Sequence, residues 1–124
     1  MKNQFVGYKE SKKLSKLGFS EECFGGYLKK DKTIWIGYVS SQGGEQFNRY
    51  YHILAPTFSQ AFKFFRDNYK MSETIWSHQS KWYFSIKDII TGHYFEGDSP
   101  EYKSYEETEL ECLKKLIEIV KEKK

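Results

Sequence analysis

The C-terminal stretch that begins at Ser104 restricts the fold of this chain more than any other feature. Ser104 and Glu107 have the Ser-x-x-Glu spacing of a capping box, in which each side chain satisfies a backbone N–H at the start of a helix. Glutamates crowd the first turns and lysines the last, which complements the helix dipole. The sequence therefore predicts an amphipathic C-terminal helix that closes the domain, with an apolar stripe of Leu110, Leu113, Leu116, Ile117 and Val120.

A second helix is predicted after Pro56. Thr57 and Gln60 form another capping box, and the pattern ends near Tyr69 or Lys70. Its apolar residues recur at helical spacing and are mostly aromatic, which predicts that this face packs on a sheet. These residues are Phe58, Ala61, Phe62, Phe65 and Tyr69.

Segments rich in β-branched and aromatic residues lie on both sides of this central helix. Residues 33–39 and 46–54 flank a Ser-Gln-Gly-Gly loop and predict one hairpin, while residues 73–77 and 81–89 predict another. Residues 92–96 add a short third strand or extend the turn. Nearer the start, residues 10–17 predict a short helix stopped by Gly18, and residues 22–28 predict a strand.

This order of elements predicts an α+β fold over a single domain, residues 1–124. Hairpins dominate, so the sheet should be mainly antiparallel, with the central and C-terminal helices packed on it. The two hairpin-plus-helix units also allow a degenerate ββα repeat. At 124 residues the chain is long enough for one proper core.

Charge is unevenly distributed along the chain. The net charge is +3, but the first 32 residues hold eight lysines against four acids, a balance of +4. Only Arg49 and Arg66 can grip phosphate in the bidentate manner of a guanidinium, which weakens the case for dedicated nucleic-acid binding. A solvated face is the preferred interpretation of the basic patch Lys9, Lys12, Lys13 and Lys16.

Aromatic residues make up 19% of the chain, and large rings build both cores and binding faces. Residues 47–52 are the most suggestive stretch, because an arginine among rings can stack on or clamp a nucleotide-like ligand. Core packing is the favoured alternative for these rings. The candidate ligand- or partner-binding residues are Trp35, Arg49, Tyr50, Tyr51, Trp76 and Trp82.

The sequence offers no recognisable catalytic or cofactor motif. Cys112 falls beside the apolar stripe of the last helix, and Cys23 follows two glutamates that would raise the pKa of its thiol. The glycine pairs at 25–26 and 43–44 match no phosphate-binding loop and are interpreted as turns. We therefore expect no cofactor, no metal site and no enzymatic activity, although four potential ligands lie in or near loops: His78, His93, Glu96 and Asp98.

Three segments together carry a resemblance to known sequences. They are residues 11–19 (SKKLSKLGF), residues 54–62 (LAPTFSQAF) leading into residues 64–66 (FFR), and residues 104–120 (SYEETELECLKKLIEIV). In this order and spacing the chain resembles a group of small uncharacterised proteins from gut Bacteroidetes and their phages or mobile elements. The resemblance spans most of the chain and implies an intracellular, phage-associated protein, but it supplies no reaction or catalytic residue.

Separated cysteines and the lack of a signal-like or membrane-length apolar run also favour a cytoplasmic protein with free thiols. The leading hypothesis is a non-enzymatic binding protein that acts on a host protein or small host molecule, through an aromatic sheet surface or a homo-oligomeric interface. One alternative is a nucleic-acid-binding accessory module that uses the lysine-rich N-terminal segment. Another is a protein that sequesters a nucleotide signal.

Overall fold

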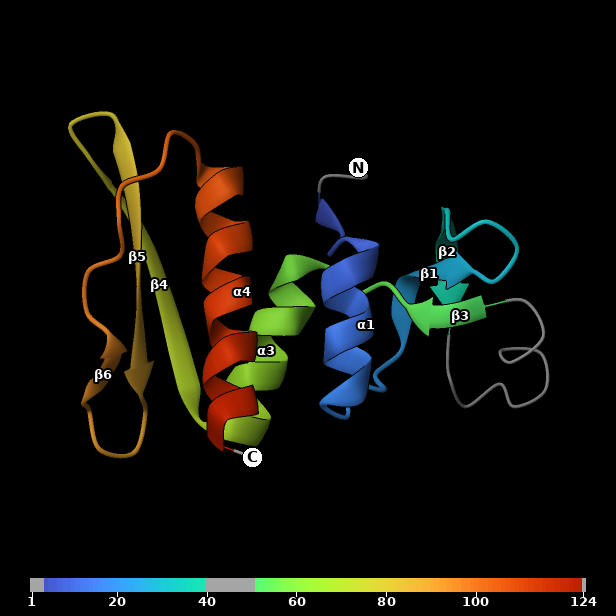
Figure 1. Cartoon of the computed structure of the whole chain (residues 1–124), viewed down its shortest axis with the longest axis horizontal. Helices are drawn as coiled ribbons and strands as arrows, with labels where there is room; N and C mark the ends of the chain where they lie inside the picture. The colour runs from blue at the N-terminus through green and yellow to red at the C-terminus, as the bar shows by residue number, and fades with distance from the viewer. Residues whose placement is uncertain (1–3, 40–50, 124) are drawn as a thin grey trace. The chain divides into compact units, whose positions relative to one another are not determined.

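The computed structural model describes residues 4–39 and 51–123 and divides into two compact units, Met1–Ala61 and Phe62–Lys124 (Figure 1). Each unit holds a three-stranded antiparallel sheet, and the chain passes from the first unit to the second within helix α3 (Phe58–Tyr69). The α+β class and the antiparallel pairing are thus confirmed, with the strands shared between two sheets. The single domain predicted for residues 1–124 stays a prediction.

The first unit contains helix α1 (Tyr8–Lys16) and a sheet of β1 (Cys23–Leu28), β2 (Ile34–Val39) and β3 (Tyr51–Leu54). The strand order is β2-β1-β3, so β1 lies in the middle and pairs antiparallel with both neighbours. The predicted hairpin between residues 33–39 and 46–54 is therefore wrong: β2 forms its hairpin with β1, and β3 lies on the far side of β1. Residues 46–50 of the predicted strand lie outside the described residues.

The physical reason for this hairpin is the turn that joins β1 to β2. Lys32 adopts a left-handed backbone conformation with φ 61°, and its N–H donates to the Leu28 carbonyl at 2.8 Å. The Asp31 carboxylate accepts hydrogen bonds from both the backbone N–H and the hydroxyl of Thr33. Asp is among the residues that stabilise turns through such local bonds, so this segment reverses the chain without a glycine.

The core of the first unit is an aromatic cluster between the sheet and the N-terminal segment. Tyr8 and Tyr27 meet edge to face with ring centroids 5.4 Å apart, and the Tyr27 hydroxyl donates to the Val6 carbonyl at 2.8 Å. Gly25 lies in β1, and a Cβ there would stand 2.9 Å from the Phe5 ring. The 25–26 pair is thus part of a strand and not a turn, because the packing of Phe5 on β1 needs a residue without a side chain.

Helix α3 begins with the predicted capping box. The Gln60 N–H donates to Thr57 Oγ1 at 3.2 Å, and the Thr57 N–H donates to Gln60 Oε1 at 3.1 Å. The side-chain amide of Gln60 also donates through Nε2 to the Glu22 backbone carbonyl at 2.8 Å, which connects the start of α3 to the segment before β1. The reciprocal bonds satisfy two backbone donors that a helix start leaves without partners.

The second unit contains β4 (Met71–His78), β5 (Lys81–Asp88), β6 (Tyr94–Glu96) and α4 (Tyr105–Lys123). Its strand order is β4-β5-β6, and the predicted hairpin around residues 78–80 is confirmed. Gln79 and Ser80 both have positive φ, 51° and 66°, as a two-residue hairpin turn that matches the twist of the strands requires. The two sheets therefore share an antiparallel plan but follow different connections along the chain.

Helix α4 packs against β4 and β5 (Figure 1). It begins as predicted, with the Glu107 N–H donating to Ser104 Oγ at 3.1 Å. The predicted apolar stripe is largely confirmed, because Leu113, Leu116, Ile117 and Val120 are buried, while Leu110 is half-buried. Within residues 4–39 and 51–123, no helix combines the length and apolar character that a membrane span needs.

Candidate functional site

The two faces of the second sheet differ in what covers them. Phe84 and Ile86 of β5 are buried on the face that α4 covers. Side chains alternate between faces along a strand, so Tyr83 points to the opposite face, called uncovered here because no described helix of this unit packs on it. Trp76 pairs with Tyr83 in the β4–β5 register and shares that face. The two rings stack with centroids 5.8 Å apart and planes inclined by 22°.

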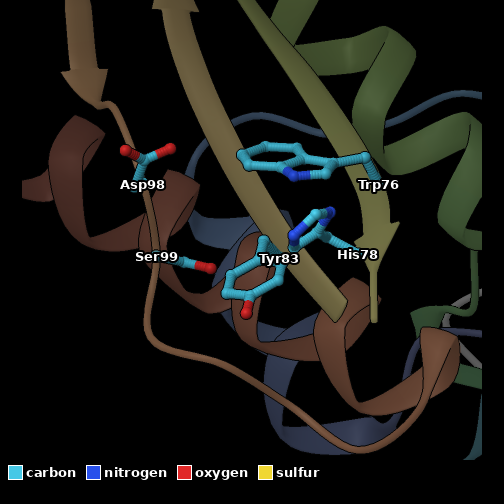
Figure 2. Close-up of a pocket in the computed structure, with 5 residues that line it drawn as sticks. All are labelled: Trp76, His78, Tyr83, Asp98 and Ser99. Atoms are coloured by element: carbon cyan, nitrogen blue, oxygen red, sulfur yellow. The ribbon is translucent and has the colours of Figure 1, made fainter. Parts of the chain in front are cut away.

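These two rings form one side of a shallow hollow of about 300 Å³ (Figure 2). Figure 2 shows the Trp76, His78 and Tyr83 side chains in front of the sheet, with α4 behind it. The backbone of residues 98–99 crosses on the other side of β5 and supplies the remaining lining. The five lining residues are Trp76, His78, Tyr83, Asp98 and Ser99.

Backbone pairing holds the connection between β6 and α4 against β5. The Ser99 N–H donates to the Phe84 carbonyl at 3.1 Å, and the Phe84 N–H donates to Ser99 Oγ at 2.9 Å. Three residues further, Trp82 and Tyr102 exchange two backbone hydrogen bonds of 2.9 Å each. Asp98 directly precedes this hydrogen-bonded segment, so its exposed carboxyl group has a defined place beside the hollow.

The lining of the hollow combines ring faces with polar groups. Ser99 is buried, and its hydroxyl donates to the Pro100 carbonyl at 2.8 Å while accepting from Phe84, so it is committed to holding the backbone. The lining offers two aromatic rings, an imidazole and a carboxyl group, and among the described residues it includes neither a thiol nor a lysine or arginine. Such a surface can stack on a ring or flat group and hydrogen-bond to its edge.

The candidate residues from the sequence fall in different places. Trp76 lies in the hollow, whereas Trp82 points to the α4 side and meets Tyr105 edge to face with centroids 5.4 Å apart. Trp35 belongs to the first unit, is 42% exposed, and lies over Gly37 so closely that a Cβ there would collide with its indole. Their proposed binding roles stay predictions.

Arg49 and Tyr50 lie outside the described residues, as does the side chain of Tyr51. The Tyr51 backbone pairs with Leu28 in the β3–β1 ladder. The stretch that the sequence singled out therefore contributes two described positions to the first sheet, Tyr51 and His52 of β3, through their backbone.

Tyr83 is not among the binding residues predicted from the sequence, and His78 and Asp98 are predicted there only as potential metal ligands. The signal for Tyr83 was present in the predicted hairpin, since Trp76 and Tyr83 lie at equal distances from the turn at Gln79 and Ser80. No comparable signal places Asp98, because its position depends on a strand-like contact with β5.

The four lysines of the predicted basic patch lie on one face of α1. Lys9, Lys12, Lys13 and Lys16 recur at positions i, i+3, i+4 and i+7, and all but the half-buried Lys13 are exposed. The Lys32 ammonium lies 5.5 Å from the centre of the Tyr8 ring, which brings a fifth lysine to the start of this helix. In the part of the chain that the structure describes, none of these five lysines forms an ion pair.

Both thiols are free and buried. Burial, followed by the Glu21 carboxylate, raises the pKa of Cys23 from 9.0 to about 12. Burial is also the main cause of the raised pKa of Cys112, with Glu73 and Glu109 adding to it. Neither cysteine is therefore an activated nucleophile at neutral pH.

The residues weighed as metal ligands do not come together as a set. His78 and Asp98 line the hollow, whereas His93 and Glu96 do not. Over residues 4–39 and 51–123, no three or more His, Cys, Asp or Glu side chains are grouped so that they could hold a metal ion. Comparisons with protein-family models, curated proteins and solved structures found no match to this chain.

Proposed function

We propose that this protein is a non-enzymatic binding protein and that the hollow beside Trp76 and Tyr83 is its recognition surface. The observation that carries the proposal is the stacked ring pair on the uncovered face of the second sheet. Four other rings of the second unit, Phe62, Phe64, Phe65 and Phe84, are buried in the core, and the remaining rings are half-buried or exposed. Trp76 and Tyr83 are only half-buried and are bordered by polar groups, as expected of residues that meet a ligand.

The size of the hollow indicates what it can hold. A volume of about 300 Å³ is at the lower end of the range for ligand pockets. It suits a small molecule or one protruding side chain of a partner better than an extended chain. This agrees with the target inferred from the sequence resemblance, a host protein or a small host molecule in the setting of a phage or mobile element.

The proposal is tested by NMR titration of the ¹⁵N-labelled protein with indole, benzoate and methylguanidine as probes of different charge. At least one probe should shift the Trp76 indole N–H and the Tyr83 backbone signals while leaving Trp35 unchanged. Trp76→Ala should abolish the Tyr83 response, and Trp35→Ala serves as the matched control. If no probe shifts these signals at concentrations up to about 10 mM, the hollow is not a recognition surface. A Kd of that size corresponds to a binding free energy of only about −3 kcal/mol.

A second candidate function is nucleic-acid binding through α1. It is favoured by one observation: the exposed face of this helix carries lysines without ion pairs among the described residues. The affinity for a fluorescent 20-mer should fall steeply with salt, and Lys12→Glu with Lys16→Glu should reduce the salt slope by about 2. The control pair Lys103→Glu and Lys121→Glu changes the net charge equally and should leave the slope less affected. A slope unchanged by the α1 pair would reject the idea.

The nucleotide-sequestering alternative receives less support from the hollow. Its carboxyl group, Asp98, would repel a phosphate, and no lysine or arginine of residues 4–39 and 51–123 lines it to compensate. That alternative needs Arg49 or lysines beside exposed rings, and Arg49 lies outside the described residues. Homo-oligomer formation stays a prediction that size-exclusion chromatography with light scattering would test.

A further inference from the structure

We propose that the hollow recognises a guanidinium group, with Trp76 and Tyr83 as the stacking surface and Asp98 as the carboxylate partner. This inference rests on the proposed function and adds the chemical class of the ligand. The faces of indole and phenol carry negative potential, so they attract cations and do not favour anions.

Asp98 adds a formal negative charge to the same surface. Its side chain is exposed at the edge of the hollow, and the hydrogen bonds of Ser99 to Phe84 hold the adjacent backbone in place. A carboxylate on a fixed backbone beside two rings matches a ligand that stacks with its face and hydrogen-bonds with its edge.

Neighbouring charges do not cancel this preference. Lys81 shares the uncovered face by register, but its ammonium is paired with Glu101, and that contact raises its pKa. Lys87 is on the same face four residues from Tyr83, about 13 Å along the strand. His78 also lines the hollow; as a neutral imidazole it can accept a hydrogen bond, and as an imidazolium it would oppose a cation.

Ring geometry selects a flat cation over a spherical one. Trp76 and Tyr83 are close to parallel, with planes inclined by 22°, so they do not form the walls of a cage around an ammonium. A planar guanidinium can stack on such a surface and at the same time present two N–H groups to one carboxylate. Its volume also suits the small hollow. The ligand is therefore a free guanidine compound or an arginine side chain of a protein.

The test compares two flat probes of similar shape, N-acetyl-arginine amide and N-acetyl-citrulline amide, whose neutral urea group has an oxygen in place of one terminal nitrogen of the guanidinium. NMR titrations of the full chain should give an arginine Kd at least about tenfold lower than the citrulline Kd, because a hydrogen bond to a charged group contributes more than a neutral one. Asp98→Asn should weaken arginine binding about tenfold and leave citrulline nearly unchanged. Trp76→Ala should weaken both, and Asp31→Asn, an exposed carboxylate of the first unit, is the control for net charge.

Two further arms identify the source of the guanidinium. Methylguanidine binding as tightly as the tripeptide acetyl-Gly-Arg-Gly amide points to a small molecule, and tighter tripeptide binding points to an arginine of a protein. Equal binding of arginine and citrulline, unaffected by Asp98→Asn, would overturn the guanidinium inference while leaving the recognition surface intact. If indole or benzoate binds but neither the arginine nor the citrulline compound does, the guanidinium inference is likewise overturned and the recognition surface is retained. Failure of every probe to shift Trp76 and Tyr83 would reject the recognition surface as well.

Discussion

Ser99 and Phe84 exchange two hydrogen bonds, one from each backbone N–H, although they lie 15 residues apart in the chain. The Phe84 ring is buried on the α4 side of the sheet, whereas Ser99 contributes to the hollow on the uncovered side. A single pair of residues thus links the core of the second unit to its candidate recognition surface. The loop that carries Asp98 is held by the same bonds.

Ser99→Ala should destabilise the protein by about 1–2 kcal/mol, because the Phe84 N–H then loses its acceptor in a buried setting. Urea denaturation followed by circular dichroism measures this change. Ser77→Ala, at an exposed position of β4, is the control and should stay within about 0.5 kcal/mol of wild type. Equal stability of Ser99→Ala and wild type would show that the bond contributes nothing.

Thr57→Ala should lower the free energy of unfolding by about 1 kcal/mol, because it removes the side-chain acceptor for the Gln60 N–H. Thr57→Ser keeps the hydroxyl and should retain most of the stability. Ser59→Ala changes an exposed residue in the first turn of the same helix and should have little effect. Thermal unfolding of the four proteins measures the differences, and equal losses for Thr57→Ala and Thr57→Ser would contradict a capping role.

Glu10 is 6% exposed, and among the described residues its Oε2 atom has no hydrogen-bond partner. A buried, unsatisfied carboxyl oxygen is costly, so Glu10→Met should raise the free energy of unfolding by about 1–2 kcal/mol. It should also lower the raised pKa of Tyr27, which is caused mainly by burial and then by Glu10. Urea titration and ultraviolet pH titration measure the two effects, with the exposed Glu22→Met as control. A destabilised Glu10→Met protein would mean that the carboxyl group has a favourable partner.

Stability should fall as the pH rises from 9 toward 12. The Cys23 thiol has a pKa of about 12 in the folded chain against an ordinary 9.0, so over this range the unfolded chain loses a proton that the folded chain keeps. Ionisation then favours unfolding, and the stabilisation present below pH 9 is lost. Urea midpoints at several pH values measure the decline, which Cys23→Ala should make shallower. An unchanged slope in that variant would remove Cys23 as a cause.

The helices were predictable because their signals are local. The Ser104 cap and the Thr57–Gln60 box each involve residues three apart, and the structure shows both. The strand pair around Gln79 and Ser80 was also predictable, since a short turn leaves few possible registers. In these places the sequence contains both partners of the interaction within one short window.

The first sheet shows why the other hairpin was mispredicted. The Ser-Gln-Gly-Gly sequence at 41–44 predicts a hairpin loop more strongly than Asp31 and Thr33 do, but the hydrogen bonds of Asp31 and Thr33 make the turn that joins β1 to β2. The choice of partner also depends on Gly25, where the Phe5 ring approaches β1 too closely for a side chain. The residues in that contact lie 20 positions apart in the chain, so no local sequence pattern predicts it.

The sequence by itself determined the described helices, most strand positions and the α+β class, because periodicity and capping act over a few residues. Only the tertiary structure decided which strands pair, how they divide between two sheets, and which aromatic residues face away from α4. Trp76 and Trp82 both fall in segments that the sequence predicts as strands of one hairpin, yet one lies in the hollow and the other packs on Tyr105. Strand register and helix packing make that distinction, since a shift of one residue exchanges the two faces of a strand.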